Sequence, residues 1–130
     1  MNEQNETFVS LRILGFPGSP ARISELLSET PSETFVIGDL RVPTAIVKHA
    51  TNGWCWESSG APTVEMMCQI KEVVDCFLPK AHLFKFLPKD TEVLLSCVLY
   101  LRGTSPQITI DPRTIQFLHE INAKIDIDIM

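Results

Sequence analysis

The chain has 130 residues, of which 45% are hydrophobic and 21% are charged. This composition is typical of one small globular domain and excludes a disordered tail or a fibrous protein. Sixteen acidic residues against eleven basic ones give a net charge of −5. Nucleic-acid binding requires clustered Lys and Arg, and neither half of the chain is basic, so we expect no nucleic-acid partner.

The N-terminal residues show no targeting signal, because they are polar and acidic and no apolar segment follows a basic one. The longest strongly apolar run, Val93–Leu101, is far shorter than the roughly 20 residues that a membrane-spanning helix needs. We therefore expect a cytoplasmic protein with no membrane partner.

Cysteine and histidine usage agrees with a reducing compartment. The four cysteines are scattered along the chain without a Cys-x-x-Cys pair, and the three histidines are equally scattered. We expect free thiols rather than disulfides. We also expect no metal and no other cofactor, because zinc sites usually draw their ligands from close pairs.

The first half of the chain predicts several short elements in succession. Thr7–Leu14 is a strand, because its residues alternate and one face is fully apolar. A helix follows over Pro20–Ser28, with a serine cap before it and the proline in its first turn. Two short strands are expected at Thr34–Ile37 and Ala45–Val47, and a clearer one at Trp54–Ser58.

The middle of the chain predicts the longest helix. Apolar residues recur at helical spacing over Val64–Leu78, so one face of this helix should cover a sheet. The opposite face, which includes Gln69, is expected to face solvent. A second short helical piece is expected over Ala81–Leu87, between two prolines.

The last third predicts two strands, a helix and a final strand. Glu92–Leu101 is nearly all apolar and reads as a buried central strand. Gln107–Ile110 is expected to be a short strand, and Asp111–Asn122 a helix that begins with an N-cap followed by proline. Lys124–Met130 alternates strictly, so we expect a strand with three isoleucines on a buried face.

These elements follow the order β-α-β-β-α-β and then β-α-β. The first six match the ferredoxin-like arrangement. We therefore predict a flexible N-terminus over residues 1–6 and a single α+β domain over residues 7–130, with a mixed, largely antiparallel sheet covered by helices. Helices on one face would leave the other face exposed or paired.

Three blocks of the sequence carry a family resemblance. Phe8–Pro31 contains the first strand and helix, and Trp54–Ser58 is similar to a W-S-L-E-S pattern. The helix Asp111–Asn122 is followed by Ile125–Met130, which is similar to a terminal L-D-I-D-I-Y. These blocks resemble the mostly bacterial domain-of-unknown-function family numbered 4279. The resemblance implies one compact bacterial cytosolic domain and brings no catalytic residue with it.

Two carboxylates near the end of the chain are candidate binding residues. Asp126 and Asp128 lie on the same face of the last predicted strand, roughly 7 Å apart. They could hold a cation or act in acid–base chemistry. The alternative is a solvated strand face, whose charges keep other strands from pairing with it.

Trp54 and Trp56 share one face of their predicted strand, and Glu57 points to the opposite face. Paired aromatic residues can form a ligand platform or an interface anchor. The alternative is ordinary core packing, because aromatic residues are common in buried strands.

No catalytic set emerges from these residues, so we expect a non-catalytic protein-interaction module, with a homodimer or another protein as partner. A concrete version is an immunity- or antitoxin-like protein that neutralises a more basic protein. The alternative is a small-ligand-binding or enzymatic domain with a pocket near Trp54, Trp56 and Asp126.

Overall fold

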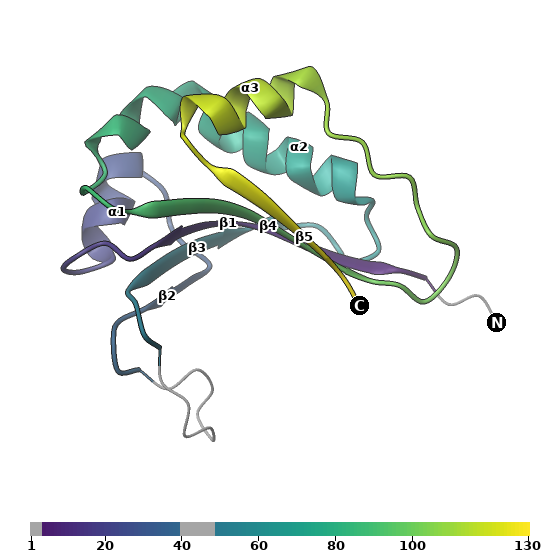
Figure 1. Ribbon diagram of the computed structural model, residues 1–130, viewed down its shortest axis with the longest axis horizontal. Helices are drawn as coiled ribbons and strands as arrows, with labels where there is room; N and C mark the ends of the chain where they lie inside the picture. The colour runs from purple at the N-terminus through teal and green to yellow at the C-terminus, as the bar shows by residue number, and fades with distance from the viewer. Residues whose placement is uncertain (1–3, 40–48) are drawn as a thin grey trace.

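The computed structural model describes residues 4–39 and 49–130 (Figure 1). The predicted strand at Ala45–Val47 lies outside these residues. The described elements, in chain order, are β1 (Glu6–Leu14), α1 (Ala21–Leu27), β2 (Glu33–Phe35), β3 (Gly53–Glu57), α2 (Met66–Phe77), the 3-10 helix η1 (Leu78–Phe86), β4 (Glu92–Tyr100), α3 (Pro112–Glu120) and β5 (Lys124–Ile129).

The strands form one five-stranded sheet in the order β2-β3-β1-β4-β5. Neighbouring strands run antiparallel except β4 and β5, which are parallel and connected through α3. The central strands β1 and β4 pair along their whole length, from Glu6 opposite Tyr100 to Leu14 opposite Glu92. The predicted α+β fold with a mixed, mostly antiparallel sheet is therefore confirmed.

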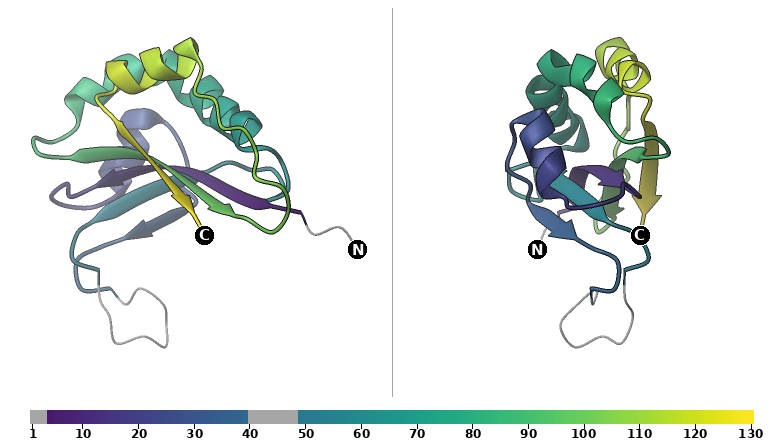
Figure 2. Two further views of the ribbon diagram at one scale, coloured as in Figure 1. Left: turned by 45° about the vertical axis from the view of Figure 1, so that its right-hand side comes forward. Right: turned by 90° about the vertical axis from the view of Figure 1, so that its left-hand side faces the viewer.

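The helices pack on one face of the sheet, and no described helix covers the other face (Figures 1 and 2). Strand alternation explains this arrangement. In β1, Val9, Leu11 and Ile13 point into the core, and in β4 Leu95, Cys97 and Leu99 do so, while the residues that alternate with them are half-buried or exposed. None of the helices in residues 4–39 and 49–130 is long and apolar enough to cross a membrane.

The prediction of a strand at Gln107–Ile110 is wrong. These residues form an extended connection between β4 and α3 without strand pairing. Both sides of β4 are already occupied by β1 and β5, so this segment has no free strand beside it. Ile108 and Ile110 instead pack, partly buried, against the core.

The C-terminal strand lies where the sequence predicts it, but its isoleucine face is not buried as expected. Ile125 packs against the core, whereas Ile127 is 37% exposed and Ile129 is 57% exposed. β5 is an edge strand, so the helix layer covers only its beginning (Figure 1). The expectation of three buried isoleucines is therefore wrong for the last two.

The first strand starts one residue earlier than predicted, at Glu6. Side-chain hydrogen bonds hold the residue before it. The Asn5 side chain donates to the carbonyl of Thr104 at 2.8 Å and accepts from the amides of Arg102 and Gly103, each at 2.8 Å. Asn5 therefore connects the start of β1 to the loop that follows β4.

Gln69 of α2 is buried, although the sequence pattern placed it on the solvent side. Its side chain accepts from the Val9 amide at 3.2 Å and donates to the Thr7 carbonyl at 2.8 Å. The pairing of β1 with β3 stops at Ser10, so these two backbone groups have no strand partner there. The Gln69 side chain thus supplies the two hydrogen bonds that a neighbouring strand would otherwise make, and it connects α2 to the sheet.

Replacing Gln69 with Leu should lower the free energy of unfolding by about 2–4 kcal/mol, because two backbone groups of β1 would lose their partners. Urea unfolding followed by tryptophan fluorescence measures this change, since Trp54 is fully buried. The control is Gln116→Leu at an exposed position of α3, which should change the free energy of unfolding by less than about 0.5 kcal/mol. Equal stability of the two variants would contradict the role assigned to Gln69.

Candidate functional site

The face of the sheet opposite the helices is the main candidate site, and we call it the open face. It carries the even-numbered residues of β1, β4 and β5 and the odd-numbered residues of β2 and β3. Ser10 lies opposite both Glu57 and Ser96, and Ser96 lies opposite Asp126. One row of side chains therefore crosses four strands, with a carboxylate at each end.

Charge is distributed unequally between the two faces of the sheet. Every charged residue of the five strands lies on the open face, and the helix-covered face carries none. The open face holds six acidic and two basic residues, an excess of four negative charges: Glu6, Glu33, Glu57, Glu92, Asp126 and Asp128 against Arg12 and Lys124. The excess of four negative charges on the open face thus accounts for most of the chain's net charge of −5.

Ion pairs compensate only part of this negative charge. Lys124 lies 3.0 Å from Glu92, and Arg102 lies 3.0 Å from Glu6. The hydrogen bond and the charge of Glu92 raise the pKa of Lys124, so this amine stays protonated. The other four acidic residues form no ion pair with the described residues: Glu33, Glu57, Asp126 and Asp128.

Apolar side chains lie beside these carboxylates. The rings of Phe8 and Tyr100 meet edge to face at 5.8 Å and are 40% and 38% exposed. Val98 lies opposite Phe8 on one side and opposite Asp128 on the other. Aromatic residues are enriched in protein–protein interfaces, so this exposed pair makes the open face a candidate binding surface.

The two tryptophans face the core and do not form a ligand platform. Trp54 is fully buried, and its indole N–H donates to the Ser24 hydroxyl at 2.9 Å. The Trp56 ring meets Phe77 of α2 edge to face at 5.3 Å. The tryptophans therefore lie on the opposite face of the sheet from Asp126. Their strand, β3, is also separated from β5 by β1 and β4. The three residues that were expected to line one pocket therefore lie on two faces of the sheet.

Glu57, Asp126 and Asp128 remain on the open face, as the alternation predicts. Asp126 and Asp128 project from one edge strand, while Glu57 lies across the sheet on β3. Within residues 4–39 and 49–130, no three His, Cys, Asp or Glu side chains gather closely enough to hold a metal ion.

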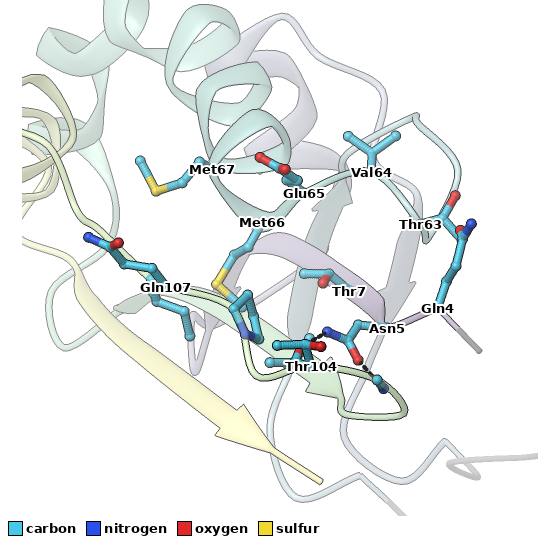
Figure 3. Close-up of a pocket in the computed structure, with 14 residues that line it drawn as sticks. Gln4, Asn5, Thr7, Thr63, Val64, Glu65, Met66, Met67, Thr104 and Gln107 are labelled. Atoms are coloured by element: carbon cyan, nitrogen blue, oxygen red, sulfur yellow. Dashed lines mark hydrogen bonds between the residues drawn. The ribbon is translucent and has the colours of Figure 1, made fainter. Parts of the chain in front are cut away.

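A second candidate is a hollow at the N-terminal end of α2, which the sequence analysis missed (Figure 3). It encloses about 610 Å³, within the size range of small-molecule sites. Thr7, which is only 5% exposed, is one of the residues that line this hollow. The lining comes from three separate regions and carries one charged group, Glu65, so no motif marks it in the sequence.

The thiols contribute no reactive group to either candidate. Burial raises the pKa of Cys55 to about 11 and that of Cys97 to about 12. Burial and a hydrogen bond to the Glu29 carboxylate raise the pKa of Cys76 to about 12. These three thiols are therefore protonated at neutral pH and are poor nucleophiles. Cys68 is exposed on α2.

A disulfide reagent such as DTNB should modify Cys68 alone in the folded protein, because the other three thiols are protonated and at least partly buried. Absorbance of the released thiolate measures one rapid equivalent, and three more should follow only after denaturation. The variant Cys68→Ser should lose the rapid phase. Rapid modification of a second thiol in native protein would contradict the packing around Cys55, Cys76 or Cys97.

Comparison with known proteins agrees with the resemblance noted in the sequence. The family model described as Domain of unknown function (DUF4279) matches residues 5–130. Searches of curated proteins and of solved structures gave no match. The match begins just before β1 and ends with the final residue after β5, so it includes the open face and all residues that line the hollow except Gln4. The chain belongs to the DUF4279 family.

Proposed function

We propose that this domain is a non-catalytic protein-interaction module that binds a basic protein through the open face. The observation that carries the proposal is the charge distribution of the sheet: all strand charges lie on this face, and four carboxylates there have no ion-pair partner among the described residues. A basic surface would neutralise them and would be drawn to them during encounter.

The dimensions of the open face set the size of the interface that it can form. The nine-residue strands β1 and β4 span about 30 Å, and the four strands from β3 to β5, about 4.8 Å apart, span about 15 Å. The β2 end adds little exposed surface, because Phe35 and Cys55 are buried. The resulting area, on the order of 450 Å², is about half of the roughly 800 Å² that each partner contributes to a standard interface. Phe8 and Tyr100 supply apolar contact area within the acidic surroundings.

The specific form that we propose is an immunity- or antitoxin-like role, in which the domain covers a positively charged surface of its partner. Charge complementarity supports this form, since masking a basic site needs an acidic surface of similar extent. We place the domain and its partner in the cytoplasm, where a reducing environment suits the four free thiols.

We also propose the finer description of the fold as a ferredoxin-like core to which α3 and β5 are added. Two features support it: β3 lies between β1 and β2, and β1 lies between β3 and β4. This interleaving is that of a split β-α-β unit. An experimental structure with a different strand order would contradict it.

A second candidate function is the binding of a small neutral ligand in the hollow beside α2. Its volume of about 610 Å³ and its mixed polar and apolar lining favour this function, because both are typical of small-molecule sites. Native mass spectrometry of freshly purified protein should then detect a bound small molecule. Thr7→Val keeps the side-chain shape and should lose that molecule, whereas the absence of any bound species in wild-type protein would contradict this function.

The leading proposal predicts that neutralising two open-face carboxylates weakens binding. The partner is identified by affinity purification with the full chain and then purified, and calorimetry measures the dissociation constant. The double variant Glu57→Gln, Asp126→Asn should raise it about 3- to 30-fold, because each exposed ion pair contributes modestly. The loss should be larger at low salt, where screening is weaker.

The control variant removes two exposed carboxylates from the helical side, Glu25→Gln and Glu120→Gln, and so changes the net charge equally. It should leave the dissociation constant within about twofold of wild type, because these groups lie away from the open face. An equal effect of the two double variants, or no effect of either, would contradict binding through the open face.

A further inference from the structure

The outer edge of β5 exposes unpaired backbone groups. The Met130 amide donates to the Leu99 carbonyl at 2.8 Å, and the Leu101 amide donates to the Met130 carbonyl at 3.0 Å. In a parallel ladder such bonding alternates along the strand, so Asp126 and Asp128 also bond toward β4. The N–H and C=O groups of the intervening isoleucines therefore point away from the sheet, and no described strand pairs with them.

The side chains of β5 differ sharply between its two faces. Ile127 and Ile129 lie on the helix side and are 37% and 57% exposed. Asp126 and Asp128 lie on the open face, and neither forms an ion pair with the described residues. A strand added to this edge would place alternate side chains beside the isoleucines and beside the carboxylates.

We propose that β5 accepts an extended segment of the basic partner as a sixth strand of the sheet. The segment alternates Lys or Arg, placed opposite Asp126 and Asp128, with apolar residues that cover Ile127 and Ile129. This mode of recognition draws affinity from main-chain hydrogen bonds and specificity from the alternating side chains. It rests on the proposed function, because the basic partner is the same, and it names the segment through which that partner binds.

A second copy of this chain fits the edge less well. If β5 paired with β5 of a second copy, the Asp126 and Asp128 side chains of both copies would lie on the same face of the joined sheet. These like charges would repel one another. Lys124 is the one basic residue of β5, and Glu92 of β4 already holds it at 3.0 Å. The acidic residues thus disfavour self-association and favour a basic strand.

The other edge of the sheet is a poorer acceptor. β2 has only three residues, Glu33–Phe35, whereas β5 has six and spans about 20 Å. A six-residue edge offers outward backbone groups at three positions, those of Ile125, Ile127 and Ile129. The added strand is therefore assigned to β5.

The test is Ile127→Pro. Proline lacks the outward N–H and places its ring on the edge, while the bonds between β4 and β5 run through the neighbouring residues and remain. We expect the dissociation constant of the purified basic partner to rise at least about tenfold. Ile127→Ala, the control, keeps the N–H and removes the side chain, so it should weaken binding by a smaller factor.

Amide hydrogen exchange of the wild-type chain keeps the proposal testable if the proline variant does not fold. The outward amides of Ile127 and Ile129 should exchange rapidly in the free chain and slowly in the complex. Absence of this protection, or unchanged binding by folded Ile127→Pro, would overturn the added strand. Protection that grows with protein concentration in the absence of partner would overturn it in favour of self-pairing.

Binding through the open face and strand addition at β5 can be contradicted by different results. If Glu57→Gln, Asp126→Asn weakens binding but Ile127→Pro does not, the open face binds the partner without an added strand. If Ile127→Pro and the amide protection behave as expected but the charge variant has no effect, main-chain strand addition at β5 stands, whereas a basic residue opposite Asp126 and binding through the acidic open face are both contradicted.

Discussion

The antiparallel pair β1 and β4 is the constraint on which the rest of the molecule depends. The two strands pair over nine residues each, so their alternation is locked in register along the whole sheet. One side of both strands is apolar, and the helices must cover it to remove it from water. A shift by one residue would turn Val9 and Leu95 outward, so the apolar pattern also determines where the charges lie.

The surface chemistry follows from this arrangement. Charged strand residues are excluded from the covered face because burying an unpaired charge is costly. They lie instead on the open face, which carries six acidic and two basic residues. β5, added in parallel beside β4, extends this acidic surface to an edge whose backbone remains unpaired. The proposed binding surface and the proposed strand acceptor are therefore parts of one continuous region.

Local patterns in the sequence predict the elements well, but long-range neighbours cannot be predicted from them. The N-cap before α3 is correct, because Asp111 accepts from the Thr114 amide only three residues away. The burial of Gln69 was missed, because its partners lie in β1, about sixty residues earlier. The tryptophans were rightly placed on one face, but only the strand order reveals that Asp126 lies on the other.

Methyl-resolved NMR of the complex tests the central claim most directly, because neighbouring residues of β4 report on opposite faces. Leu94 and Val98 lie on the open face, and Leu95 and Leu99 lie in the core. On titration with the purified basic partner, the methyl signals of Leu94 and Val98 should shift while those of Leu95 and Leu99 stay in place. Larger shifts at Leu95 and Leu99, or at Ile108 beside the hollow, would contradict binding through the open face.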